Sequence, residues 1–293
     1  MTMYGTIKKV AAIHDLSGFG RASLTAIIPT LSSMGVQVCP LPTAILSNHT
    51  GGFECYSYVD LTDSMEEYIQ MWKNLKLEFD CIYSGFLGST RQINIVADFI
   101  DYFGTKDNLV VVDPVMGDNG KLYSSFTPEI VPEMRKLIAK ADLITPNFTE
   151  AAFLLGMEKC PEQFSDETAK EWLLKLAEMG PKIVVITSAP DMNNRENTNV
   201  VAYDKENNMF WKVGCRYIPA AYPGTGDTFT SVVIGSLLQG DSLPVSLDRG
   251  TQFISQCIKA SYGFNYPKRN GVLLEKELGI LNTPVLISGY ELM

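Results

Sequence analysis

Segments with the apolar pattern of strands alternate with segments with the apolar pattern of helices along this 293-residue chain, which predicts a parallel α/β fold. Residues 7–13 are typical of a strand, and residues 21–34 carry apolar side chains at helical spacing until Gly35 ends the helix. Residues 36–46 favour a second strand. A strand, a helix and another strand in this order form a parallel unit, because the helix returns the chain to the starting end of the sheet.

The same alternation continues along the chain and indicates one doubly wound domain over residues 1–293. Further helices are predicted over residues 63–75, 91–103, 127–140, 171–179 and 244–263, with another that starts at Gly224. Short buried strands are predicted within residues 81–88, 109–112, 141–145 and 182–186. Residues 199–213 differ, because two strand-like runs flank a polar turn and predict a β-hairpin. We therefore expect a mostly parallel central sheet, helices on both faces and a hairpin near residues 199–213.

Polar and glycine-rich segments follow several of the predicted strands. Five of them carry useful chemistry, namely residues 47–51, 84–88, 113–118, 145–150 and 224–227. In open α/β sheets the carboxyl ends of the strands share one rim, and ligands bind there. The sequence therefore predicts that these segments meet in one site.

The segment Gly224-Thr-Gly-Asp227 begins a helix of small and apolar residues. Two glycines at a helix start let unpaired backbone N–H groups approach an anion, and the helix dipole adds positive charge. Asp227 is unexpected in a simple anion site, because a carboxylate repels phosphate. A phosphoryl-transfer enzyme needs this pair, a base for an alcohol beside a pocket for the transferred charge. The alternative is an Asp that only caps its own helix.

Two further segments carry carboxylates. Asp113 and Asp118 follow the buried strand 109–112, and such oxygen ligands suit Mg²⁺, although Asp113-Pro114 could also form only a turn. Asn147 and Glu150 lie three residues apart at a helix start. They form either a capping box or contacts to a metal and phosphates.

The net charge of -9 argues against nucleic acid or an anionic membrane as a partner. It also means that a divalent cation and local N–H groups must hold an anion such as ATP. The N-terminal residues lack the apolar region of a signal peptide, and no apolar run reaches the ~18 residues that span a membrane. The six cysteines have no paired spacing. We therefore expect a cytoplasmic protein.

Other nucleotide-binding signatures are missing from the sequence. There is no Gly-x-x-x-x-Gly-Lys-Ser/Thr segment and no His-Arg-Asp or Asp-Phe-Gly motif, which excludes P-loop enzymes and protein kinases. Gly18-Phe-Gly20 follows the first strand but lacks the third glycine of a dinucleotide fingerprint. A nicotinamide cofactor is therefore not supported.

Together the motifs resemble a known family. Gly224-Thr-Gly-Asp227 resembles the signature of the ribokinase superfamily, and the other four segments, Ser47-Asn-His-Thr-Gly51, Ser84-Gly-Phe-Leu-Gly88, Asp113-Pro-Val-Met-Gly-Asp118 and Thr145-Pro-Asn-Phe-Thr-Glu150, resemble its pyridoxal kinase branch. The resemblance implies a ribokinase-like three-layer α/β/α sandwich that uses ATP and Mg²⁺. It also implies phosphorylation of the 5′-hydroxymethyl group of a B6 vitamer (pyridoxal, pyridoxamine or pyridoxine) by a homodimer.

The resemblance assigns roles to single residues. Asp227 would be the catalytic base, beside an anion hole formed by Gly224, Thr225 and Gly226. The substrate would contact Asp15, Ser17, Thr50 and Phe86. The nucleotide would contact Asp113, Asp118, Asn147, Thr187, Ser188 and Thr225. Mg²⁺ would be held by Asp113, Asp118 and Glu150, the last through water. No motif assigns the adenine pocket, and the aromatic segment Tyr262–Pro267 belongs either to it or to the core.

Two positions depart from the pattern of that branch. The first strand of pyridoxal kinases usually ends in a Ser that contacts the substrate, whereas Asp15 takes this place here, and Phe86 stands where relatives often have Tyr. Because a carboxylate near the ring favours a cationic group, we hypothesise a preference for pyridoxamine. The alternatives are a hydroxymethylpyrimidine kinase and a nucleotide-binding protein that has lost catalysis. A sugar kinase is disfavoured, because the first loop lacks an Asn and Asp cluster for several hydroxyls.

Overall fold

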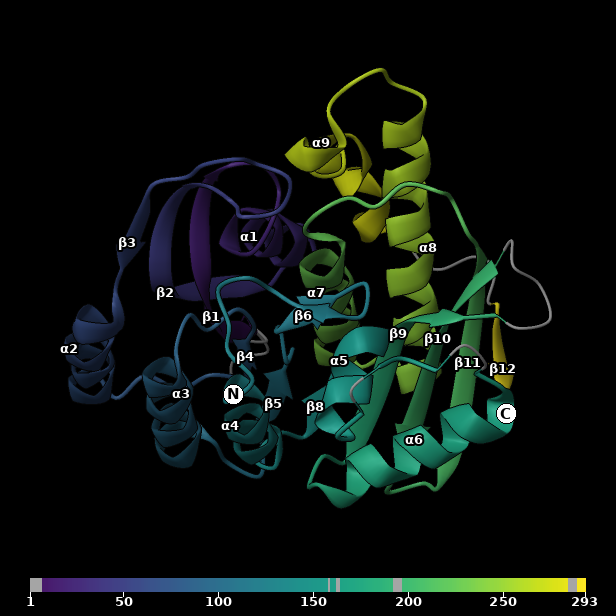
Figure 1. Cartoon of the computed structure of the whole chain (residues 1–293). Coiled ribbons are helices and arrows are strands. Elements are labelled where there is room, and N and C mark those ends of the chain that lie inside the picture. Colours follow the sequence, from purple (N-terminus) through teal and green to yellow (C-terminus); the bar gives the residue numbers. More distant parts are fainter. Residues whose placement is uncertain (1–6, 158, 162–163, 192–196, 284–288) are drawn as a thin grey trace, which may run out of the picture.

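Strands from both ends of the chain belong to one sheet in the computed structural model, which describes residues 7–157, 159–161, 164–191, 197–283 and 289–293 (Figure 1). The strands of this sheet are β1 (Lys9–Phe19), β2 (Gln37–Asn48), β3 (Tyr58–Asp60), β4 (Cys81–Ser84), β5 (Leu109–Val112), β8 (Leu143–Ile144), β9 (Ile183–Pro190), β10 (Asn197–Asp204), β11 (Met209–Arg216) and β12 (Tyr290–Leu292). Across the described residues they lie in the order β12-β11-β10-β9-β8-β5-β4-β1-β2-β3. Two short strands, β6 (Gly117–Asp118) and β7 (Lys121–Leu122), form a separate hairpin.

The centre of the sheet is parallel and its edges are antiparallel. Strands β2, β1, β4, β5, β8 and β9 pair in parallel. Strand β3 at one edge and strands β10, β11 and β12 at the other pair in antiparallel fashion. The predicted hairpin near residues 199–213 is therefore confirmed as β10 and β11. Because the central strands are parallel, the loops that follow them start at one rim of the sheet.

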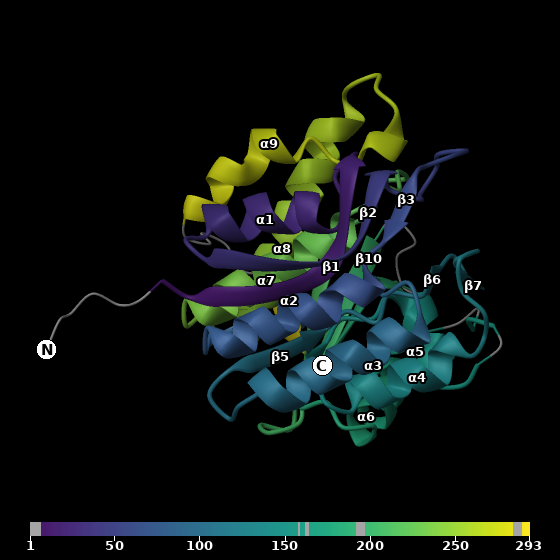
Figure 2. The same cartoon turned by 90° about the vertical axis from the view of Figure 1, so that its left-hand side faces the viewer.

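Helices cover both faces and confirm the predicted three-layer α/β/α arrangement. They are α1 (Leu24–Ser33), α2 (Thr62–Asn74), α3 (Thr90–Phe103), α4 (Ile130–Ile138), α5 (Phe148–Leu154), α6 (Asp166–Glu178), α7 (Thr225–Leu238), α8 (Leu243–Tyr262) and α9 (Leu274–Glu277), with 3-10 turns η1 (Lys268–Asn270) and η2 (Leu278–Asn282). Figure 2 shows α1, α7 and α8 on one side of β1 and α2 to α6 on the other.

Strand β5 illustrates why the central strands are apolar throughout. Val110 and Val112 pack into the core beneath α2 to α6, whereas Val111 packs into the core beneath α1, α7 and α8. Successive residues of a strand point to opposite faces, and both faces of this sheet are covered by helices. None of the described helices is long and apolar enough to cross a membrane.

Several predicted boundaries were wrong, and three of them have a clear physical reason. The first strand does not end at Ile13 but continues to Phe19, with an irregularity in its pairing to β2 between His14 and Leu16. The helix predicted over residues 127–140 begins only at Ile130, after a turn in which the Ile130 N–H bonds to the Thr127 carbonyl. The helix predicted over residues 171–179 begins earlier, at Asp166, because Ser165 caps it through the Thr168 N–H.

Candidate active site

A cavity of about 700 Å³ lies at the rim of the sheet where β8 and β9 end. Its walls come from the start of α5, the ends of β9 to β11, the first turn of α7 and one side of α8. Six residues predicted for the site line it, namely Asp118, Asn147, Thr187, Ser188, Thr225 and Gly226. The structure therefore brings together segments that are up to about a hundred residues apart, as the fold rule predicted.

The loop before α7 has a conformation that requires glycine. Gly224 has a φ of 78°, in the left-handed region, and a Cβ at this position would collide with the carbonyl oxygen of Arg21. Thr225 donates its hydroxyl to the Tyr222 carbonyl, 3.1 Å away, and thereby fixes the first turn. Since Thr225 and Gly226 line the cavity, the start of α7 faces it with the positive end of its dipole.

Asp227 does not cap its own helix. Its Oδ2 accepts a hydrogen bond of 2.8 Å from the backbone N–H of Ser23, which precedes α1. Its Oδ1 lies 3.9 Å from Nδ1 of His14, and the side chain is 14% exposed. Burial raises the pKa of Asp227 to about 6. His14 does not neutralise this carboxylate, because burial lowers the pKa of His14 to about 3.

Two more buried carboxylates lie behind the cavity. Burial, with the charges of Glu150 and Asp227 nearby, raises the pKa of Asp113 well above its usual value. Burial also raises the pKa of Glu150 to about 8, although backbone N–H groups bond to it. Since the charges of Glu150 and Asp227 raise the pKa of Asp113, the site favours the arrival of positive charge.

The capping box predicted as one option for Asn147 and Glu150 is present. The Asn147 side chain accepts from the N–H groups of Thr149 and Glu150, at 2.9 and 3.0 Å. Both Glu150 oxygens accept backbone N–H bonds, from Asn147 at 2.8 Å and from Met116 at 3.1 Å. Glu150 therefore holds the loop after β5 against α5, while Asn147 still lines the cavity.

The carboxylates predicted for Mg²⁺ differ in availability. Among the described residues, no three His, Cys, Asp or Glu side chains are arranged to hold a metal ion. Both oxygens of the exposed Asp118 accept from Asn119. None of the described residues donates a hydrogen bond to the Asp113 carboxylate, which is 6% exposed.

The residues predicted for the substrate lie beside the cavity, around the ends of β1, β2 and β4. Asp15 is buried and accepts hydrogen bonds from the hydroxyls of Ser17, at 2.9 Å, and Ser23. Burial raises the pKa of Asp15. Ser17 is completely buried, so its predicted contact with the substrate stays a prediction.

The outer residues of this region are less enclosed. Phe86 is half-buried, with its ring 5.5 Å from that of Phe126. Thr50 is exposed, so its predicted contact with the ring stays a prediction. The hydroxyl of Tyr58 approaches Gly88, and burial raises the pKa of this hydroxyl to about 12.

Several residues at the rim were not found from the sequence. The cavity is lined by Ala220, Thr251, Ile254 and Ile258, whereas none of the residues from Tyr262 to Pro267 lines it. Tyr262 and Phe264 are each 53% exposed, so they do not belong to the core, and a role of this segment at the adenine stays a prediction. Apolar positions on one helix look alike whether they face a core or a cavity, so no sequence signal marked α8.

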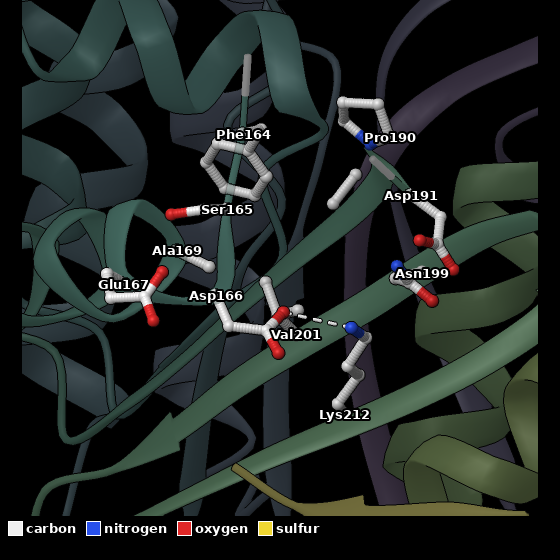
Figure 3. A pocket seen from close by; sticks show the side chains of 11 residues that line it. Phe164, Ser165, Asp166, Glu167, Ala169, Pro190, Asp191, Asn199, Val201 and Lys212 are labelled. Atoms are coloured by element: carbon white, nitrogen blue, oxygen red, sulfur yellow. Dashed lines mark hydrogen bonds and ion pairs between the residues drawn. The ribbon is translucent and has the colours of Figure 1, made fainter. Parts of the chain in front are cut away.

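A second cavity of about 280 Å³ lies away from these residues, between α6 and strands β9 to β11 (Figure 3). Asp166 and Lys212 form an ion pair of 2.9 Å in its wall. Asn199 is the residue that this cavity shares with the large one. None of the residues predicted for the site lines it.

Comparison with known proteins gave consistent matches. A family model described as phosphomethylpyrimidine kinase matches residues 18–272. The solved structure of pyridoxal kinase from Lactobacillus plantarum is 31% identical with a TM-score of 0.85, over 94% of this chain and 97% of that chain. A putative phosphomethylpyrimidine kinase from Bacteroides thetaiotaomicron, crystallised with pyridoxal, is 56% identical with a TM-score of 0.95, over 98% of this chain and 100% of that chain. Pyridoxal kinase from Arabidopsis thaliana is 29% identical over 260 residues, which are 84% of this chain and 78% of that protein.

Proposed function

Since this chain belongs to the phosphomethylpyrimidine kinase family and to the pyridoxal kinase branch of the ribokinase superfamily, we propose that it is a kinase for B6 vitamers. It transfers the γ-phosphoryl group of ATP to the 5′-hydroxymethyl oxygen of the vitamer. The observation that carries this proposal is the position of Asp227. Its carboxylate lies in the first turn of α7, between a 700 Å³ cavity on one side and the Asp15 region on the other.

Asp227 is suited to accept the proton of the hydroxymethyl group. With a pKa of about 6, it is ionised at neutral pH and more basic than an ordinary Asp. The alcohol loses its proton late in a loose transition state, so a carboxylate of this strength suffices. In the reaction the O–H bond of the substrate and the bond between the γ-phosphorus and ADP break, while a new P–O bond forms and the proton passes to Asp227.

The start of α7 stabilises the transferring phosphoryl group. Gly226 lines the cavity without a side chain that would keep an anion away from the backbone, Gly224 allows the left-handed turn before α7, and Thr225 holds that turn in place. Backbone N–H groups that are already in position cost no reorganisation when charge develops. Asn147, Thr187 and Ser188 line the same cavity and are the contacts to the ATP phosphates.

The residues fit Mg²⁺ bound together with ATP. Mg²⁺ uses one or two carboxylates, with water and phosphate oxygens as its other ligands. Asp113 is the carboxylate that receives no hydrogen bond from a described residue, and Asp118 lines the cavity. Glu150, with both oxygens engaged by backbone N–H groups, takes part through water. When bound, the metal supplies positive charge that neutralises the phosphate oxygens.

The adenine and ribose lie in the part of the cavity between β11 and α8. Ile218, Ala220, Ile254 and Ile258 supply apolar walls there. Arg216 is the one cationic side chain among the described residues that line the cavity, and it makes no ion pair with another described residue. It therefore compensates part of the charge of ATP.

A second candidate function is the phosphorylation of hydroxymethylpyrimidine or its phosphate. The description of the family model and the name of the 56% identical relative favour it. The pyridoxal that was crystallised with that relative favours the B6 vitamers. Hydroxymethylpyrimidine and the B6 vitamers both carry a ring, a hydroxymethyl group and a basic nitrogen, so one site chemistry serves either of these alcohols.

We infer that the protein is a cytoplasmic homodimer. Two apolar side chains are exposed at one edge of the sheet, Val59 on β3 at 52% and Ile45 on the adjacent β2 at 44%. A second copy of the chain that packs against this edge would cover them. Val59→Lys is expected to give a monomer by light scattering. A dimer that persists in this variant removes this edge as the contact.

Purified protein incubated with ATP and Mg²⁺ tests the proposal when pyridoxal, pyridoxamine, pyridoxine and hydroxymethylpyrimidine are compared as acceptors. We expect the highest kcat/KM with a B6 vitamer. A higher value for hydroxymethylpyrimidine would replace the proposal by the second candidate. Turnover of none of them would leave a nucleotide-binding protein.

A further inference from the structure

Ser23 contacts both carboxylates that flank the proposed place of reaction. Its backbone N–H donates to Oδ2 of Asp227 at 2.8 Å, and its hydroxyl donates to Oδ1 of Asp15. Asp15 belongs to β1 and Asp227 to α7, more than two hundred residues apart. Ser23 is 7% exposed, so water does not readily replace either bond.

The conformation of Ser23 is unusual for its position. Ser23 is the N-cap residue of α1, where a Ser normally accepts a hydrogen bond from the first turn of the helix. Here its side chain makes no such bond, and its φ is 50°, in a region that residues other than glycine seldom adopt. Both departures turn the N–H and the hydroxyl away from the helix and toward the two carboxylates. Strained residues of this kind are typical of functional sites.

The loop that ends at Ser23, residues 20–23, is held in place by contacts on several sides. The hydroxyl of Thr25 lies 2.7 Å from the Ala22 carbonyl and 3.1 Å from the Gly20 carbonyl. Gly224 and Gly271 have no Cβ where Arg21 packs against them. The loop therefore fits closely between the anion-binding turn and the C-terminal part of the chain, and Ser23 has little freedom to move.

We propose that Ser23 is a positioning residue, which holds the carboxylate of Asp227 at a fixed position and orientation relative to the substrate ring. Its N–H occupies Oδ2, which leaves Oδ1 to accept the proton of the hydroxymethyl group. Its hydroxyl fixes this arrangement to Asp15 beneath the ring. This inference rests on the proposed function of Asp227 and adds a residue that acts through it.

The proposal gives Asp15 a second role besides any contact with the ring. Both of its oxygens accept serine hydroxyls, from Ser17 and Ser23. Loss of the Asp15 carboxylate is therefore expected to loosen Ser23, and through it Asp227. Because ATP binds on the other side of Asp227, its binding is expected to stay unchanged. A shift of about 1 Å in a reacting group lowers a rate by up to ~100-fold.

The test compares Ser23→Ala and Ser23→Gly with the wild type, by steady-state kinetics with ATP, Mg²⁺ and pyridoxal. Both variants lose the hydroxyl, but glycine adopts a φ of 50° without strain and keeps the N–H bond to Asp227. We expect kcat to fall at least tenfold in both, with KM for ATP within twofold. Ser242→Ala is the control, because Ser242 is the N-cap of α8, also without a side-chain capping bond. It is expected to match the wild type, and thermal unfolding of each variant reports folding.

A double-mutant cycle with Asp15→Ala completes the test. If Ser23 acts through Asp15, the double variant Asp15→Ala/Ser23→Ala is no slower than the slower single variant, within about threefold. The proposal is overturned if both Ser23 variants keep kcat within twofold of the wild type, or if the two effects multiply in the double variant. Asp227→Asn, measured in parallel, separates the two ideas. Activity retained in Asp227→Asn refutes the proposed base, whereas activity lost there but kept in the Ser23 variants refutes only the role of Ser23.

Discussion

Replacement of Asp227 by Asn is expected to stabilise the protein while it removes the proposed base. The amide oxygen still accepts the N–H of Ser23, so the hydrogen bond of 2.8 Å is kept. The change removes a buried negative charge that also raises the pKa of Asp113. A functional residue of this kind is maintained at a cost to folding, so its loss improves stability.

The magnitude and its pH dependence follow from the raised pKa of Asp227. The shift from the usual 3.8 to about 6 is about two units, or ~3 kcal/mol at ~1.4 kcal/mol for each unit. A raised carboxyl pKa means that the folded state binds the proton more tightly than the unfolded state. The charge therefore costs no stability below about pH 4, and the cost grows until the pH exceeds about 6. Asp227→Asn carries no such cost at any pH.

Urea unfolding of the wild type and Asp227→Asn at pH 4.5 and pH 8, without ATP or Mg²⁺, measures this difference. We expect the variant to gain up to about 3 kcal/mol at pH 8 and clearly less at pH 4.5. Asp107→Asn is the control, because Asp107 is exposed and the change is expected to have little effect at either pH. A variant that is no more stable than the wild type at pH 8, or that gains equally at both pH values, would refute this reasoning.

Three other predictions concern the two sides of the site. Gly224→Ala is expected to lower kcat by more than ~100-fold and stability by more than ~2 kcal/mol, because the new Cβ meets the Arg21 carbonyl. Gly240→Ala is the control, because Gly240 has a φ of 96° with open space around it. This change is expected to lower the free energy of unfolding by only ~1 kcal/mol and to leave activity unchanged. Equal effects of the two changes in unfolding and kinetic assays would contradict the role of the collision. Arg216→Gln is expected to raise KM for ATP by ~10-fold with kcat within twofold, because one ionic contact to a phosphate contributes ~1.5 kcal/mol to binding. An unchanged KM would place ATP away from Arg216. Asp15→Asn, which keeps an oxygen for Ser23, is expected to lower the ratio of kcat/KM for pyridoxamine to that for pyridoxal, and an unchanged ratio would remove the hypothesis of a pyridoxamine preference.

The motifs that were predicted correctly have local causes. Gly224 needs a left-handed backbone, β5 needs apolar side chains on both faces, and Asn147 with Glu150 forms a capping box within four residues. Each of these requirements is met by residues close together in the sequence. The rule that parallel strands end at one rim then brings the loops together without further information.

The parts that were missed depend on contacts between distant residues. The first strand was predicted to end at Ile13, before the polar residues His14, Asp15 and Ser17, yet β1 continues through them. Asp15 is paired with Ser17 and with Ser23 of the next segment, which satisfies its oxygens inside the fold. In the same way, no local pattern separates Ile254 and Ile258, which line the cavity, from Phe253, which lies in the core.

The central claim is most directly tested by following the formation of pyridoxal 5′-phosphate from pyridoxal and ATP with the wild type and Asp227→Asn. Binding of ADP to both proteins is measured by calorimetry to show that the cavity is intact. The account predicts rapid phosphate transfer by the wild type, a rate lower by at least ~1,000-fold in the variant, and ADP affinities within about threefold of each other. Phosphate transfer by Asp227→Asn at a rate close to that of the wild type would contradict the account.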